Sequence, residues 1–252
     1  MIPRTDLLAY LDELLETASF DDYAPNGLQV EGKPEIRRIV GGVTASQALV
    51  DEAVARGADA LLVHHGYFWR GEDPSVVGIK QRRLKALLQA DINLLAYHLP
   101  LDAHPQLGNN ARLAKLLGIR VKGGFGGGRG PDIGQYGELI TPLSGPAFAE
   151  VLADKLDRMP LHIDGEAAEI RTIAWCSGAA QGYIEQAAAL GADAYLTGEV
   201  SEQTVHLARE VGIHFFSAGH HATERYGVQA LGAHLAEKYA IEFEFVDIHN
   251  PV

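Results

Sequence analysis

Apolar residues follow two spacings along the chain, one typical of helices and one typical of buried strands. Near the N-terminus, leucines recur at i, i+3, i+4 and i+7, which predicts an amphipathic helix over residues 4–18. Farther on, short uninterrupted apolar runs alternate with helical patterns. The predicted strands are 39–43, 60–63 and 92–97, and the predicted helices are 46–56, 80–90 and 109–117. This alternation predicts an α/β fold, with mostly parallel sheets flanked by helices.

An internal repeat indicates that this α/β pattern occurs twice. The segment that begins at Ile39 aligns without a gap with the segment that begins at Ile173, an offset of 173 − 39 = 134 residues. Within it, the GADA sequence of residues 57–60 recurs at residues 191–194. The repeat therefore predicts two similar lobes, each built on a mostly parallel sheet.

A glycine-rich segment separates the two copies of the repeat. Residues 123–134 read GGFGGGRGPDIG, a composition typical of a flexible connector. We therefore expect a first lobe over 1–122 and a second over 135–252. The last apolar segment, 241–248, is a candidate for crossing back onto the sheet of the first lobe.

Charge and composition exclude several classes of protein. The chain has 252 residues, and 21 Lys and Arg against 33 Asp and Glu give a net charge of 21 − 33 = −12. Such a charge argues against nucleic acid as a partner, because affinity for nucleic acid comes largely from neutralised phosphates. Cys176 is the only cysteine, so no disulfide can form within the chain. No apolar run approaches the roughly 20 residues of a membrane span and no signal-peptide pattern precedes the first helix, so we expect a cytoplasmic protein without a membrane partner.

Metal-binding side chains follow the predicted strands 60–63 and 92–97 and a third apolar run, 213–218, in the second copy of the repeat. In chain order these side chains are His64 and His65, then His98 and Asp102, and then His220 and Glu224. Because ligands bind beyond the carboxyl ends of parallel strands, we expect a metal site in the cleft between the lobes. Adjacent histidines point to opposite sides of an extended strand, so His64 and His65 reach one site only if the backbone turns there. Imidazole and carboxylate ligands suit Zn, Mn, Fe or Ni, and a carboxylate such as Glu224 can bridge two ions.

Four other polar residues are candidates for proton transfer or substrate contact near the metal. His98 and Glu199 are candidates for proton transfer, and the repeat places Glu199 at the position of His65. Asn26, in a turn, and Thr44, at a strand end, are candidates for contact with a substrate.

Several motifs together resemble the Nif-three-like dinuclear metal-centre family, whose members are often labelled GTP cyclohydrolase I type 2 homologues. The motifs are DYAPNGLQVEG, GVTASQALVDEA, VHHGYFW, HLPLDAHPQLGNN, TGEVSEQ and AGHHATERYG. The resemblance covers nearly the whole chain and is to the compact bacterial form. It implies two-lobed subunits in a toroidal homohexamer, a trimer of dimers, with two divalent ions per subunit. The positions that match the family's metal ligands are His64, His65, Asp102, His220 and Glu224.

These expectations lead to two hypotheses about function. The first is a dinuclear metal-dependent hydrolase, similar to GTP cyclohydrolase I type 2, that acts on a nucleotide or phosphoester-type small molecule with water activated by the metals. The alternative is a non-catalytic hexameric protein that binds metal or serves as a scaffold. The sequence leaves both the substrate and the native metal open.

Overall fold

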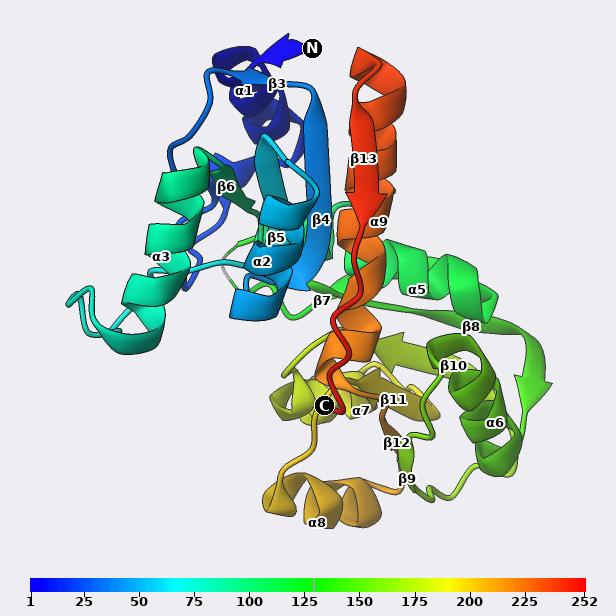
Figure 1. Cartoon of the computed structure of the whole chain (residues 1–252). Helices are drawn as coiled ribbons and strands as arrows, with labels where there is room; N and C mark the ends of the chain where they lie inside the picture. The colour runs from blue at the N-terminus through cyan, green and yellow to red at the C-terminus, as the bar shows by residue number, and fades with distance from the viewer. Residues whose placement is uncertain (129) are drawn as a thin grey trace. The chain divides into compact units, whose positions relative to one another are not determined.

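Two compact units make up the described part of the chain, residues 1–128 and 130–252 of a computed structural model (Figure 1). Unit 1 comprises Met1–Leu101 and Gly227–His249, and unit 2 comprises Asp102–Tyr226 and Asn250–Val252. This division differs from the one expected from the glycine-rich segment, since residues 102–122 lie in unit 2. Helix α4 (Leu99–Ala103) and helix α9 (His220–Tyr239) each contribute residues to both units.

Unit 1 contains a five-stranded sheet in the order β13-β4-β5-β6-β2, counted over the described residues. The first four strands run parallel, and β2 runs antiparallel to β6. The C-terminal strand thus lies beside β4 in this sheet, as the apolar segment 241–248 suggested. The elements of this unit are β1 (Ile2–Pro3), α1 (Arg4–Leu14), a 3₁₀ turn (Thr17–Ser19), β2 (Gly27–Val30), β3 (Glu35–Ile36), β4 (Arg38–Thr44), α2 (Gln47–Ala55), β5 (Ala60–His65), α3 (Gly78–Ala90), β6 (Asn93–Ala96) and β13 (Glu242–Phe245).

Unit 2 contains a mixed six-stranded sheet in the order β7-β8-β10-β11-β12-β9, within the described ranges. Only β10, β11 and β12 run parallel there, so this sheet is less parallel than we expected. The elements are α5 (Asn109–Leu117), β7 (Ile119–Phe125), β8 (Gly134–Leu143), α6 (Gly145–Leu156), β9 (Leu161–Ile163), β10 (Ile170–Trp175), a 3₁₀ turn (Gln181–Tyr183), α7 (Ile184–Ala189), β11 (Ala194–Thr197), α8 (Glu202–Val211) and β12 (His214–Ser217).

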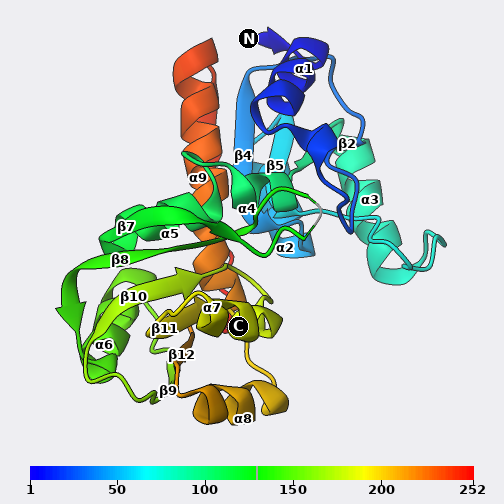
Figure 2. The ribbon, with the colours of Figure 1, turned by 180° about the vertical axis from the view of Figure 1, so that it is seen from behind.

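The glycine-rich segment links two paired strands of unit 2. Strands β7 and β8 pair antiparallel, with Phe125 opposite Gly134, and they lie side by side in both views (Figures 1 and 2). Residues 123–125 and 134 therefore belong to paired strands of one unit. Arg129, in the middle of the predicted connector, lies outside the described residues.

The internal repeat is also visible in the backbone hydrogen bonds of each unit. In unit 1, Asp59 Oδ2 accepts from the backbone N–H groups of Arg37 and Arg38, at 2.9 and 3.0 Å. In unit 2, Asp193 Oδ2 accepts from the N–H groups 134 residues later, those of Arg171 and Thr172, at 2.9 and 2.8 Å. The units also share a feature of strand order, since β2 lies antiparallel to β6 as β9 lies antiparallel to β12.

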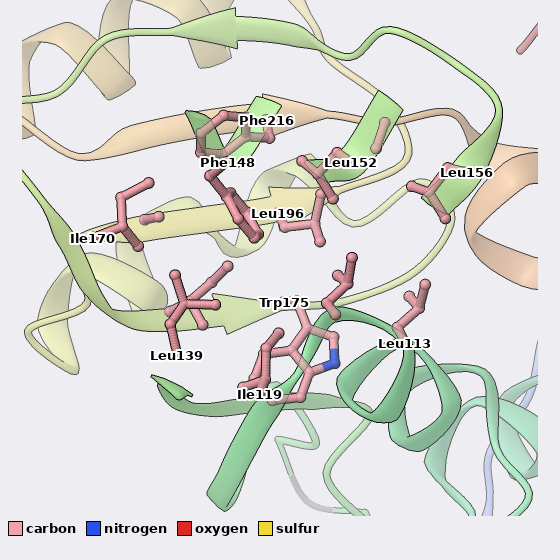
Figure 3. Close-up of a cluster of buried hydrophobic side chains, with 14 of the residues drawn as sticks. Leu113, Ile119, Leu139, Phe148, Leu152, Leu156, Ile170, Trp175, Leu196 and Phe216 are labelled. Carbon is pink, nitrogen blue, oxygen red and sulfur yellow. The ribbon is translucent and has the colours of Figure 1, made fainter. Parts of the chain in front are cut away.

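Each unit has its own apolar core, and the core of unit 2 holds Trp175, the largest of the fully buried side chains among the described residues. Trp175, Phe148 and Phe216 are fully buried there, and the two phenylalanine rings meet edge to face with centroids 5.1 Å apart (Figure 3). The indole N–H of Trp175 donates to the carbonyl of Asn110 at 3.0 Å, so its polar atom is satisfied inside the core. Among the described residues, no helix is long and apolar enough to cross a membrane.

Candidate metal centre

His64 and His65 lie at the end of β5 in unit 1 and present their rings to the same region. Their ring centroids are 4.6 Å apart, and the His98 ring lies 5.1 and 5.6 Å from them. Each of the three offers a ring nitrogen, and these nitrogens lie within 4.8 Å of one another. Both residues still belong to β5, yet their rings lie together with that of His98, and this cluster is able to hold a metal ion.

Hydrogen bonds at Nδ1 orient the first two rings. His64 Nδ1 lies 2.9 Å from the carbonyl oxygen of Tyr97, which can only accept, so Nδ1 carries the proton and Nε2 the lone pair. His65 Nδ1 lies 3.1 Å from the Thr44 hydroxyl. Metal-binding histidines commonly use one ring nitrogen for such a bond and the other for the ion. Thr44, predicted to contact substrate, is thus placed to hold His65.

Asp22 holds His98, although nothing in the sequence singled it out. Its carboxylate lies 2.7 Å from His98 Nδ1 and accepts from the Asn26 side chain and the Leu99 backbone, both at 2.9 Å. Burial raises the pKa of Asp22, but these hydrogen bonds outweigh it and leave the pKa below its usual range. Asn26 Oδ1 in turn accepts from the backbone N–H of His98 at 2.8 Å. The Asn26 amide therefore bridges Asp22 and the backbone of His98. The Trp69 ring meets the edge of His98, with centroids 5.1 Å apart.

Asp102 is a buried carboxylate near the start of unit 2, with 4% of its surface exposed. One of its oxygens, Oδ1, accepts from Asn109 Nδ2 and from the Ser177 hydroxyl, each at 2.9 Å. These two neutral donors fix the plane of the carboxylate without neutralising its charge. Neither Asn109 nor Ser177 was singled out in the sequence, because each holds a ligand and has no metal chemistry of its own.

His220 and Glu224 lie one turn apart at the start of helix α9. The helix begins at His220, and His220 Nε2 lies 3.1 Å from Glu224 Oε2, while Nδ1 lies 2.7 Å from Glu199 Oε1. Burial lowers the pKa of His220, but Glu224 and Glu199 outweigh it and raise the pKa to about 9. Without a metal this imidazole is therefore protonated at neutral pH, and the pair of carboxylates favours a cation at this place.

Two buried carboxylates of unit 2, Asp102 and Glu224, both raise the pKa of the Cys176 thiol. Burial raises the pKa of Cys176 well above its usual value, and the charges of Asp102 and Glu224 raise it further. Glu224 is 2% exposed, so its charge is also held in a medium of low dielectric. Such carboxylates persist in a fold when they are paired or bind a metal. Cys176 itself stays a protonated, inert side chain.

The nine predicted site residues therefore fall into two sets. His64, His65 and His98 lie together in unit 1, with Thr44 and Asn26 bonded to them. His220, Glu199 and Glu224 lie together in unit 2, and Asp102 is held there by its own two donors.

The chain is similar to known proteins over its full length. A family model described as Duf34/NIF3 (NGG1p interacting factor 3) matches residues 2–251. A Pseudomonas aeruginosa protein named GTP cyclohydrolase 1 type 2 homolog is 60% identical over 250 residues, which cover 99% of each chain. A solved structure described as protein ybgI, of unknown function, is 52% identical with a TM-score of 0.96 over 100% of both chains. A solved structure from Thermus thermophilus is 36% identical with a TM-score of 0.91, again over 100% of both.

Proposed function

Because the chain belongs to the Duf34/NIF3 family, we propose that it is a dinuclear metal-dependent hydrolase of small nucleotide or phosphoester substrates. The proposed ligands of the two divalent ions are His64, His65, Asp102, His220 and Glu224. Curated relatives that bear the name GTP cyclohydrolase 1 type 2 homolog support the choice of substrate class.

One feature of the proposed ligands carries this proposal. The three histidines each engage Nδ1 with an oxygen, namely Tyr97 O, Thr44 Oγ1 and Glu199 Oε1, at 2.9, 3.1 and 2.7 Å. The same ring atom, Nε2, is therefore the ligand atom in all three. Holding a ring through its other nitrogen raises its basicity and fixes its direction, which is how proteins prepare histidines for metals.

The residues around the ligands support a hydrolytic role. When bound, a pair of divalent ions lowers the pKa of water to about 7 and stabilises charge on phosphoryl oxygens. His98, oriented by Asp22 at 2.7 Å, is placed to take up or deliver a proton at its Nε2. Glu199 holds the proton on His220 Nδ1 and so keeps Nε2 in the form that binds metal. We further propose that the protein assembles as a homohexamer, a trimer of dimers, which sedimentation equilibrium of the purified chain would test.

Metal content and turnover together test the proposed function. The purified chain, freed of metal by a chelator, is reloaded with Mn²⁺ or Zn²⁺ and assayed on nucleoside triphosphates and on bis(p-nitrophenyl) phosphate. We expect about two ions per chain at the five proposed ligands, and turnover that Glu224→Gln abolishes. Glu202→Gln is the matched control, because Glu202 also pairs with a histidine four residues away but is exposed on α8.

The outcomes separate the alternatives. Turnover that follows metal content and is unchanged in Glu202→Gln supports the hydrolase. Two bound ions without turnover on any substrate overturn the hydrolase and favour a metal-binding protein or scaffold. A wild-type chain that binds neither ion overturns the ligand assignment itself.

A further inference from the structure

A second cluster of metal-binding side chains lies in unit 2, on residues that are not among the proposed ligands. His162 is in β9, His214 opens the neighbouring strand β12, and Asp164 follows β9 directly. One ligand atom from each lies within 4.8 Å of the other two. From this geometry we propose that His162, Asp164 and His214 form a separate site for one first-row divalent ion of the zinc type.

The distances between the ligand atoms suit a single ion. His162 Nε2 lies 3.1 Å from His214 Nδ1 and 3.5 Å from Asp164 Oδ1, and the third distance, from His214 Nδ1 to that oxygen, is 4.0 Å. Ligands about 2.0–2.1 Å from a tetrahedral zinc ion are separated by about 3.3–3.4 Å. The longest distance involves Asp164, whose side chain is 79% exposed and is therefore able to turn toward the ion. Its exposure also gives an ion a path from solvent and leaves room for a water ligand.

The two imidazoles are already oriented. His214 Nε2 lies 2.8 Å from the carbonyl of Ala167, so it carries the proton and Nδ1 carries the lone pair. The His162 ring stacks on buried Phe216 with centroids 4.4 Å apart and planes 6° from parallel. A ring bonded to a carbonyl through one nitrogen and offering the other is the usual arrangement of a metal-binding histidine.

A comparison of the two units shows that the imidazole of His214 exceeds what the fold needs. Asn93 is the counterpart of His214, because Asn93 N donates to Asp59 O as His214 N donates to Asp193 O, each at 3.0 Å. Asn93 Oδ1 accepts from Gly32 N at 2.9 Å, as His214 Nδ1 accepts from Gly165 N at 3.1 Å.

An amide at this position is therefore enough to hold the loop to the sheet. That role explains a polar group at 214, but it does not explain an imidazole, a second histidine at 162 and a carboxylate at 164. When an ion binds, it takes over the lone pair that Gly165 N uses, so one backbone hydrogen bond is exchanged for three ligand bonds.

Cobalt and zinc binding to the whole chain test this site. Metal-free protein is titrated with Co²⁺, followed by its visible absorption, and then with Zn²⁺, with metal per chain measured after gel filtration. We expect His162→Gln to bind one ion fewer than wild type and Asp164→Asn to bind that ion at least 10-fold more weakly. His206→Gln is the matched control, because His206 also lies near a carboxylate, at 2.9 Å, but is exposed and joins none of the metal-binding groups found among the described residues.

The result is independent of the proposed hydrolase. A double variant, His65→Ala with Glu224→Gln, should keep this one ion, whatever the fate of the other centre. Unchanged stoichiometry and Co²⁺ spectrum in His162→Gln would overturn the proposal, as would an equal loss in His206→Gln. Because Asp164 is exposed, Asp164→Asn should fold normally, and its unchanged Zn²⁺ affinity would overturn the proposal even if His162→Gln failed to fold.

Discussion

Gly178 lies against the carboxylate of Glu224, and a single added methyl group there should displace a proposed metal ligand. A Cβ atom on Gly178 would stand 2.1 Å from Glu224 Oε1 and 3.2 Å from His220 Nε2. Non-bonded carbon and oxygen atoms stay about 3.3 Å apart, so in Gly178→Ala this oxygen must move by at least about 1 Å.

The backbone of Gly178 cannot retreat from this contact. Its N–H donates to Thr223 Oγ1 at 3.0 Å, and its carbonyl accepts from Gly198 N at 2.9 Å and from Thr197 Oγ1 at 3.1 Å. The carboxylate therefore moves instead. Metal–ligand distances tolerate only about 0.2 Å, so we expect the affinity of the Glu224 site for Zn²⁺ to fall by about 100-fold.

The same substitution also strains the backbone, and a second glycine isolates that effect. Gly178 has φ +67°, where an L-residue costs about 1–2 kcal/mol. Gly191 has φ +73° but has nothing within 4 Å of its added Cβ. Gly191→Ala should therefore lose about the same 1–2 kcal/mol in urea unfolding and bind Zn²⁺ as wild type does. If calorimetric titration gave Gly178→Ala the affinity of Gly191→Ala, the placement of Glu224 as a ligand would be refuted.

Three further predictions concern stability and turnover. Burial raises the pKa of Asp193, but its hydrogen bonds lower it overall, so its stabilisation is present above about pH 4 and is lost as pH falls through the lowered pKa. Asp193→Asn should cost about 2 kcal/mol in urea unfolding at pH 7 and progressively less as the pH falls below 4, and a cost that does not change with pH would contradict this. Phe148→Ala empties a fully buried position and should destabilise the chain by about 3–5 kcal/mol in the same assay, where a loss below about 1 kcal/mol would show that the core had collapsed around it. Asp22→Asn should leave elemental metal content unchanged but lower kcat at least about 10-fold, because His98 loses the carboxylate that orients it, and an unchanged kcat would remove His98 from proton transfer.

The central strands of unit 1 could be predicted from the sequence, whereas the boundary between the units could not. Uninterrupted apolar runs predicted β4, β5 and β6, because strands buried on both faces contain little else. The glycine-rich segment 123–134 was interpreted as a connector from its composition alone. Its flanks pair as β7 and β8, and such pairing depends on contacts across the strands that local composition does not encode.

The candidate ligands could be found from residue type and position, but the residues that orient them could not. Histidine and carboxylate side chains are common metal ligands, so those that follow apolar strands can be recognised as candidates from the sequence alone. Asp22 and Ser177 lie in turn-rich or apolar surroundings, and their importance comes only from the 2.7 and 2.9 Å contacts that folding creates. Asp22 opens the motif DYAPNGLQVEG, but nothing in that motif says which residue it would hold.

A comparison of the two copies of the repeat distinguishes residues that hold the fold together from residues proposed to act at the metal site. Asp59 and Asp193 are identical and make the same backbone bonds, because each copy must join neighbouring strands in the same way. The far ends of those strands differ, with His65 in one copy and Glu199 in the other. The two copies therefore differ at positions proposed to hold or orient a metal ligand, and agree at positions that hold the strands together. The same reasoning applies to Asn93 and its counterpart His214. The amide of Asn93 is enough to hold the loop to the sheet, so the imidazole of His214 is consistent with the proposed metal site.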